Sequence, residues 1–286
     1  MAAIAVIGAT GTIGGRLTGR LIAQGEAVRA VCRNPGGLGD GVDAEAADLL
    51  DPTQALDALD GVDAVYLTSI LGGDDIFATE RTVAENVIDA AVKHDVDHVI
   101  MHTALRADRG DTGARILDNK TPIEKRLASS GIGYTILRPA WFLQNLWGAK
   151  DYLEQGVVSM PWPGDMVWAA TDVEDVVTAA VSCFEHGPAM RGFDIHIPGG
   201  ITGEQIAEAA TAVLGRHVAY HEAEVSSREY VSAFPISEAH KDAYAGLFDY
   251  FKSTTYLGDP HPIADALPGY EPRGIEQFLR EELFAG

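Results

Sequence analysis

The stretch that decides the fold lies near the N-terminus and reads Ile4-Ala5-Val6-Ile7-Gly8-Ala9-Thr10-Gly11-Thr12-Ile13-Gly14. Its apolar start predicts a buried strand, and the glycines follow with the spacing G-x-x-G-x-x-G. A helix should come next, because Ile13, Leu17 and Leu21 recur with its period and Gly25 can end it. A glycine turn between a strand and a helix lets a dinucleotide pyrophosphate approach the backbone and the helix N-terminus. The stretch therefore predicts a Rossmann-type unit, with a plain tight turn as the alternative.

Four more short apolar runs predict the other strands of the same sheet. They lie at 27–32, 64–67, 98–101 and 134–137, and helical or loop segments separate them. Continuous apolar runs that alternate with helices are typical of a parallel sheet covered on both faces. We therefore expect an α/β protein with a Rossmann-type doubly wound parallel sheet in residues 1–141. A smaller C-terminal α+β substrate lobe, residues 142–286, should be intertwined with it.

The second half of the chain also predicts regular elements. A helix is expected at 173–184, a strand at 193–197, a second helix at 201–214 and a short strand at 219–221. Thr202 and Gln205 mark the start of the second helix, and Gly215 marks its end. Further on, Tyr244, Phe248 and Phe251 have the spacing of one face of a helix. This spacing favours packing in the core over a role as a lid.

Composition narrows the classes of function. The 286 residues carry a formal net charge of −21, which argues against a direct nucleic-acid partner because phosphate contacts need a basic surface. No apolar run is long enough to span a membrane, and the N-terminus lacks the features of a signal peptide. Cys32 and Cys183 fall in apolar patterns typical of reduced core thiols. We expect a cytoplasmic monomer or homodimer that binds a small-molecule substrate and no metal.

The residue after the second strand distinguishes between the two nicotinamide cofactors. NAD-binding units place an acidic side chain there, which accepts a hydrogen bond from the ribose 2′-hydroxyl. Here the run is Val31-Cys32-Arg33-Asn34-Pro35. A guanidinium can pair with a 2′-phosphate through two hydrogen bonds, whereas a carboxylate would repel it. Arg33 therefore favours NADP(H), with a solvated surface arginine as the alternative.

With these motifs, the sequence resembles the NmrA-like family of atypical short-chain dehydrogenase/reductases over nearly the whole chain. The resemblance rests on the glycine loop, on 31–35, 47–49, 65–69 and 171–176, and most specifically on 130–139 with the aromatic residues that follow. It implies substrate contacts for Trp141, Phe142 and Asn145. It implies NADP(H) contacts for Gly8, Thr10, Gly11, Thr12, Ile13, Arg33, Asp48, Leu49, Thr68, Ser69, Thr103, Lys120 and Pro139.

The chain departs from ordinary short-chain dehydrogenases at the proton donor. Those enzymes place a tyrosine four residues before a lysine, but Ile116 stands four residues before Lys120. Thr103 occupies the place of the usual serine. We expect Lys120 and Thr103 to be catalytic, with Lys120 contacting the ribose or stabilising an oxyanion. The run 121–124 resembles a capping box, which would place Lys120 just before the start of a helix. The alternative interpretation of Lys120 is an exposed lysine without a functional role.

Other residues have competing interpretations. Strand alternation points His102 away from Thr103, so a hydrogen-bonded sheet histidine is favoured over a proton donor. Trp141 and its neighbours could form a flat wall for a planar substrate, or could simply pack between the lobes. Asp172 and Asp175 look like acids that complement the dipole of a helix start, and not like a catalytic pair.

Together these features predict an NADPH-dependent oxidoreductase that transfers hydride to a quinone-like or conjugated carbonyl substrate. Reduction of a quinone gives a stabilised phenolate, so little general-acid catalysis is needed and the tyrosine can be missing. One alternative is a non-enzymatic NADP(H) redox sensor that acts through a protein partner. Another is a reductase or isomerase of a secondary-metabolite pathway.

Overall fold

The computed structural model describes residues 3–39, 41–259, 263, 267 and 270–285. The chain forms two compact units, each assembled from separate stretches of sequence. Unit 1 contains Met1–Gly110, Asn119–Arg138 and Val176–Phe193, and unit 2 contains Asp111–Asp118, Pro139–Asp175 and Asp194–Gly286. The chain passes from unit 1 to unit 2 at 110/111, 138/139 and 193/194.

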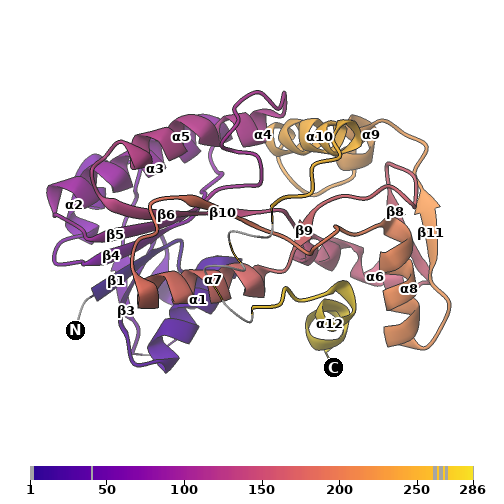
Figure 1. Cartoon of the computed structure of the whole chain (residues 1–286), viewed down its shortest axis with the longest axis horizontal. Coiled ribbons are helices and arrows are strands. Elements are labelled where there is room, and N and C mark those ends of the chain that lie inside the picture. Colours follow the sequence, from indigo (N-terminus) through magenta and orange to yellow (C-terminus); the bar gives the residue numbers. More distant parts are fainter. Residues whose placement is uncertain (1–2, 40, 260–262, 264–266, 268–269, 286) are drawn as a thin grey trace. The chain divides into compact units, whose positions relative to one another are not determined.

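Unit 1 is built on a seven-stranded sheet with the order β10-β6-β5-β4-β1-β2-β3 (Figure 1). From β3 to β6 every neighbouring pair is parallel, so the carboxyl ends of these strands share one edge. This confirms the doubly wound parallel sheet. The strands are β1 (Ala3–Ile7), β2 (Ala27–Cys32), β3 (Asp43–Ala46), β4 (Ala64–Leu67), β5 (His98–His102), β6 (Gly133–Pro139) and β10 (Gly192–Ile195).

Helices cover both faces of the sheet (Figure 1). On one face, α2 (Pro52–Ala58), α3 (Ile76–Lys93) and α5 (Lys120–Ala128) bury apolar residues against the strands in one core. On the other face lie α1 (Thr12–Ala23) and α7 (Val173–His186), where Arg20 donates to Thr178 Oγ1 at 3.1 Å. The predicted apolar stripe of α1 is buried, as a helix that covers a sheet requires.

One strand of unit 1, β3, has no signal in the sequence. Its four residues, Asp43 to Ala46, are all exposed, so no apolar run marks it. It forms the edge of the sheet and pairs with β2. The five strands predicted from apolar runs are confirmed as β1, β2, β4, β5 and β6, because each is enclosed by neighbours and helices.

Unit 2 has a separate, aromatic core. Trp162 is buried edge-on to Trp168 and Phe248, with ring centroids 5.1 and 5.3 Å away. Phe248 belongs to this core, and Tyr244 and Phe251 pack against it, which confirms core packing for this helical face. Two short parallel pairs lie in the unit, β8 (Val157–Met160) with β11 (Ala219–Glu222) and β7 (Trp141–Phe142) with β9 (Ala170–Thr171).

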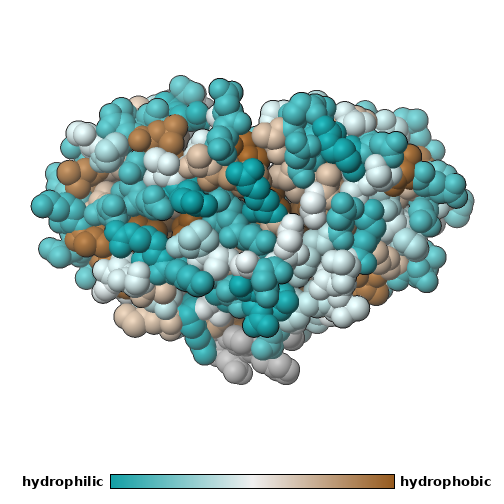
Figure 2. All heavy atoms as spheres, turned by 90° about the horizontal axis from the view of Figure 1, so that it is seen from above, coloured by the Kyte–Doolittle hydropathy of each residue, from teal (hydrophilic) through white to brown (hydrophobic). Residues whose placement is uncertain are grey.

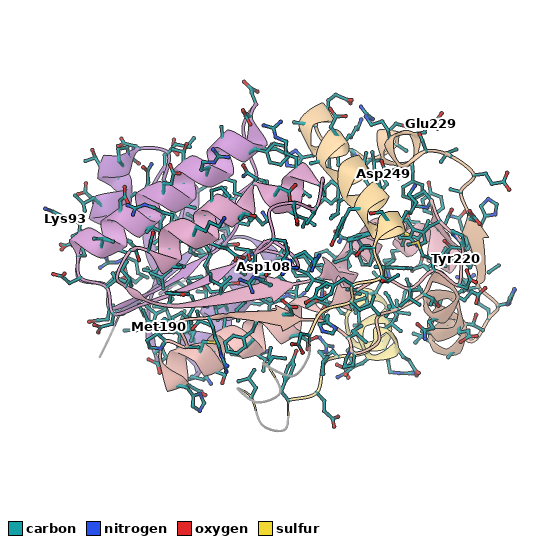
Figure 3. The ribbon with its side chains drawn as sticks, turned by 45° about the horizontal axis from the view of Figure 1, so that its top comes forward. Lys93, Asp108, Met190, Tyr220, Glu229 and Asp249 are labelled. Carbon is teal, nitrogen blue, oxygen red and sulfur yellow. The ribbon has the colours of Figure 1, made fainter. Side chains whose placement is uncertain are left out.

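Some helices of unit 2 begin with a reciprocal side-chain cap. At α8 (Gly203–Leu214), Thr202 and Gln205 form the reciprocal hydrogen bonds of a capping box, and Gly215 ends the helix with a φ of 65°. Ser227 of α9 (Ser227–Ser232) donates to Asp249 of α10 (Glu238–Ser253) at 2.6 Å. Figure 3 labels Asp249 on α10. The described residues also form η1 (Pro35–Gly37), α4 (Arg115–Asp118), η2 (Leu143–Ala149), α6 (Lys150–Glu154), α12 (Ile275–Phe278) and η3 (Leu279–Leu283).

The surface reflects the acidic, polar composition. On the face drawn in Figure 2, hydrophilic residues predominate and hydrophobic residues form small, separate patches. Within the described ranges, none of the helices is both long enough and apolar enough to cross a membrane.

Candidate functional site

The glycine loop between β1 and α1 has the backbone that close approach of a phosphate requires. Gly8 has a φ of 74°, in the left-handed region. A Cβ on Gly14 would lie 2.3 Å from the Gly8 carbonyl oxygen, so no side chain fits there. Gly11 precedes α1 without a capping side chain, Thr10 and Thr12 are exposed, and the fully described first turn of α1 contains no acidic residue. The N–H groups of this turn can therefore bind an anion, which fits a dinucleotide pyrophosphate.

Other expected cofactor residues follow strands of the same sheet. Arg33 is exposed and comes directly after β2. Asp48 is exposed after β3, and its Oδ1 accepts from the Leu50 N–H at 3.1 Å. Leu49 and Pro139 are buried, so their side chains serve the core. Because the strands are parallel, the exposed pair lies along the sheet edge that holds the glycine loop.

His102, the last residue of β5, is a buried and hydrogen-bonded histidine, as expected. Its Nδ1 lies 2.8 Å from the Tyr66 hydroxyl and its Nε2 lies 3.4 Å from Thr68 Oγ1. Burial, with a further contribution from the charge of Lys120, lowers the pKa of His102 to about 3. The imidazole is therefore neutral at physiological pH and cannot act there as a proton donor in its charged form.

Lys120 is buried and ion-paired, which corrects the expectation that it lies just outside a helix. It is the first residue of α5 and only 4% exposed. Its Nζ donates to Ser69 Oγ at 2.8 Å and forms an ion pair with Glu80 of α3. Ser69 also donates to Glu80, and the other Glu80 oxygen accepts from Asn119 Nδ2 at 2.8 Å. The alternative of an exposed bystander lysine is wrong.

The capping box expected at 121–124 does not form, because both of its polar side chains, which the structure describes, have other partners. Thr121 Oγ1 donates to the Ala107 carbonyl oxygen at 2.6 Å. Glu124 accepts from Thr103 Oγ1 at 2.6 Å and from the Arg138 guanidinium at 2.7 Å. Thr103 thus directs its one hydroxyl proton at a carboxylate and presents lone pairs to any ligand.

The expected substrate residues belong to unit 2. Trp141 is 8% exposed and lies edge-on to Trp168, with ring centroids 6.1 Å apart. Phe142 is half-buried and Asn145 is exposed. Trp141 therefore packs in the core of unit 2. Phe142 and Asn145 are the members of this set that solvent can reach.

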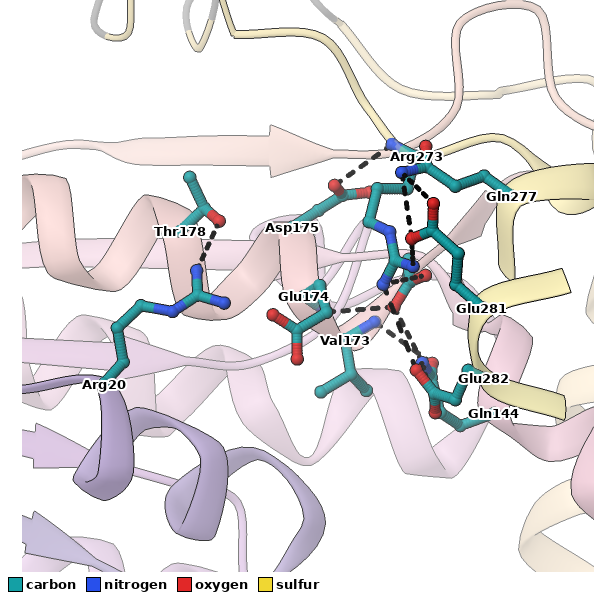
Figure 4. Close-up of polar contacts among 11 residues, drawn as sticks. Arg20, Gln144, Val173, Glu174, Asp175, Thr178, Arg273, Gln277, Glu281 and Glu282 are labelled. Carbon is teal, nitrogen blue, oxygen red and sulfur yellow. Dashed lines mark hydrogen bonds and ion pairs between the residues drawn. The ribbon is translucent and has the colours of Figure 1, made fainter. Parts of the chain in front are cut away.

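Asp172 and Asp175 belong to a polar network in unit 2 that the sequence analysis did not anticipate (Figure 4). Asp172 is completely buried, 3.1 Å from the Nη1 atom of Arg273. The Arg273 N–H donates to Asp175 at 3.2 Å, and its Nη2 donates to Glu281 at 2.8 Å. Burial raises the pKa of Asp175 to about 7, and the nearby Asp172 carboxylate acts in the same direction. Among the described residues, no three or more His, Cys, Asp or Glu side chains are arranged to hold a metal ion.

Glu80 is the site residue that the sequence analysis missed. It lies on the buried face of α3 together with Ile76, Val83, Ala84 and Val87. The signal that could have identified it is a carboxylate at a position where the helical period calls for an apolar residue. A charge buried there needs a partner, and Lys120 provides it.

Comparison with known sequences adds a family to this geometry. The family model for NAD(P)H-binding proteins matches residues 8–183. Quinone oxidoreductase 2 of Escherichia coli is 30% identical over 224 residues, which cover 76% of each chain. The NAD(P)H azoreductase of Xenophilus azovorans is 29% identical over 225 residues, again 76% of each chain.

Two solved structures share the whole architecture. The NADPH-dependent quinone oxidoreductase of Escherichia coli, in complex with NADPH, has a TM-score of 0.81 and 25% identity over 96% of this chain and 97% of that chain. The negative transcriptional regulator NmrA, in complex with NADP, also has a TM-score of 0.81, with 17% identity over 99% of this chain and 95% of that chain. The second likeness shows the fold alone.

Proposed function

Because this chain belongs to the NAD(P)H-binding family and is an NADPH-dependent oxidoreductase, we propose that it reduces a quinone-like or conjugated carbonyl compound. The expectations of family, Rossmann-type fold and cofactor are confirmed on the same grounds. The acceptor substrate and the residues that act on it are our proposal.

The position of Lys120 carries the proposal. Its ammonium group lies where α5 begins, fixed by Ser69 from the segment after β4 and by Glu80 from α3. An ammonium group has three N–H donors, and these two partners use two of them. In the contacts that the structure describes, the third N–H has no partner, and it can bind a ligand oxygen at the edge of the sheet that also holds the glycine loop. Lys120 is therefore the cation best placed to stabilise a developing oxyanion.

A quinone-like acceptor suits the donors that this site provides. The bound cofactor supplies the hydride. Lys120 gives a charge-assisted hydrogen bond to the acceptor oxygen that gains negative charge. His102 is neutral, and Thr103 directs its proton at Glu124, so neither is poised to protonate an alkoxide. A quinone avoids this need, because its aromatic product stabilises the charge on oxygen.

The relatives support an extended, conjugated acceptor. One is named a quinone oxidoreductase and another an azoreductase, and both match about three quarters of this chain. In unit 2, the half-buried Phe142 can contact a planar ring, and the exposed Asn145 can hydrogen-bond to a polar substituent.

The test is a reductase assay that follows the loss of NADPH absorbance. The panel contains benzoquinones, naphthoquinones, enones and an azo dye, with an unactivated saturated ketone as the control acceptor. We expect turnover with quinones and none above background with the saturated ketone. Tight NADPH binding without turnover of any acceptor would refute the proposal and would favour a cofactor sensor. Equal turnover of the saturated ketone would show that the site contains a proton donor that we have not identified.

A further inference from the structure

Glu80 is the centre of a closed set of buried contacts at the start of α5. One of its carboxylate oxygens is ion-paired with Lys120 and accepts the Ser69 hydroxyl proton. The other oxygen accepts from Asn119 Nδ2 at 2.8 Å. Glu80 is 3% exposed and Lys120 is 4% exposed, so water screens this pair very little.

The same helix that carries Glu80 also fixes the residue before Lys120. Arg81 Nη2 donates to Asn119 Oδ1 at 3.0 Å, and Asn119 Nδ2 lies 3.2 Å from the Phe77 carbonyl oxygen. Helix α3 therefore holds both Asn119 and Lys120 through side chains that are one residue apart. This arrangement controls the direction of the Lys120 side chain as well as its charge.

We propose that Glu80 is a positioning residue of the reductase, which keeps Lys120 in its ammonium form and directs the remaining N–H donor at the acceptor oxygen. The inference rests on the proposed function, because the acceptor is the conjugated carbonyl compound described above. The Glu80 carboxylate places an opposite charge in contact with Nζ, which offsets the cost of burying the ammonium group. Ser69 contributes to the direction of Nζ but carries no charge.

The neighbours of Lys120 leave Glu80 as the group that sets its charge. The described contacts place Glu80 of α3, Ser69 after β4 and His102 of β5 around it, while Arg81 reaches Asn119. His102 is already neutral at physiological pH, since its pKa is lowered to about 3 by burial. An arginine keeps its charge throughout the range that enzymes tolerate. A change in the alkaline part of the rate profile therefore reports on the pair of Lys120 and Glu80.

The decisive variant is Glu80→Gln, which removes the charge and keeps the size of the side chain. We expect kcat/KM of the variant, relative to the parent protein, to fall about tenfold further at pH 9 than at pH 6, because the unpaired amine loses its proton more readily. NMR titration of the labelled lysine Nζ should show Lys120 deprotonating at lower pH in the variant. NADPH affinity, measured by calorimetry at pH 6, should change little.

Two further variants separate charge from geometry. Ser69→Ala should lower kcat and leave the pH profile in place, because the ion pair is intact. Asp89→Asn breaks the exposed pair of Asp89 and Arg126, which joins the same two helices, and should change neither quantity. If Glu80→Gln does not fold, Glu80→Asp is used instead. This variant keeps the negative charge on a side chain that is one methylene shorter, so kcat should fall while the pH dependence of the rate is unchanged.

The outcomes distinguish this inference from the proposed function. A parent protein without reductase activity refutes the function, and the Nζ titration then still tests the effect of Glu80 on Lys120. An unchanged Lys120 titration and an unchanged pH profile in Glu80→Gln would overturn the inference, even in an active enzyme.

Discussion

Asp175 should make the stability of this protein depend on pH, and Asp175→Asn tests the effect directly. Burial raises the pKa of this carboxyl from its ordinary 3.8 to about 7. The folded protein therefore holds the Asp175 proton more tightly than the unfolded chain does. The amide of the variant does not titrate, yet it keeps an oxygen that can accept from the Arg273 N–H, which lies 3.2 Å from Asp175 in the parent protein.

The sign and size of the effect follow from this difference. Because the folded pKa is raised, the stabilising contribution of the Asp175 proton is complete below about pH 4 and is lost as the pH rises through 7. Each pKa unit corresponds to about 1.36 kcal/mol, so a rise of about three units corresponds to about 4 kcal/mol at most. About two of these three units lie above pH 5, so relative to Asp175→Asn the parent protein should lose about 2–3 kcal/mol of unfolding free energy between pH 5 and pH 9.

Urea unfolding followed by circular dichroism, in steps across this pH range, measures the difference. Asp151→Asn is the matched control, because Asp151 is an exposed acid in the first turn of α6. Its difference from the parent protein should stay flat. A constant difference between Asp175→Asn and the parent protein would refute the reasoning. A variant that becomes relatively less stable as the pH rises would refute its sign.

Three further predictions concern the cofactor edge. Arg33→Asp should weaken NADPH binding relative to NADH by about 1.5–3 kcal/mol, and equal affinities in the parent protein would contradict the role of Arg33. Gly11→Val should abolish NADPH binding in calorimetry while the circular dichroism spectrum is unchanged, because its side chain occupies the approach of the phosphates. Lys120→Met should lower kcat at least about tenfold, and more than Thr103→Val does, since the Thr103 proton already has an acceptor.

The sequence predicted the elements correctly where a short stretch of residues is compatible with only one local structure. The apolar runs of β1, β2, β4, β5 and β6 can be buried only inside a covered parallel sheet. At Thr202 and Gln205 the capping box forms because neither side chain has a competing partner in the described contacts. The glycine loop lies between an apolar strand and a periodic helix, which is why it predicted the Rossmann-type unit.

The failures arose where distant residues compete for the same side chain. The run 121–124 has the composition of a capping box, but Glu124 instead binds Thr103, which follows β5, and Arg138 of β6. The burial of Lys120 depends on Glu80, forty residues earlier, and no local pattern joins the two. In the same way, the sequence near Asp172 gives no indication of its ion pair with Arg273.

The exposed edge strand β3 has a consequence for how copies of this protein meet in solution. Its two acidic residues, Asp43 and Glu45, alternate along a strand whose outer edge is open to a further strand. Antiparallel pairing of two such edges would bring carboxylates of both copies together and would be electrostatically unfavourable. The two carboxylates therefore protect the open edge of the sheet against edge-to-edge association of copies.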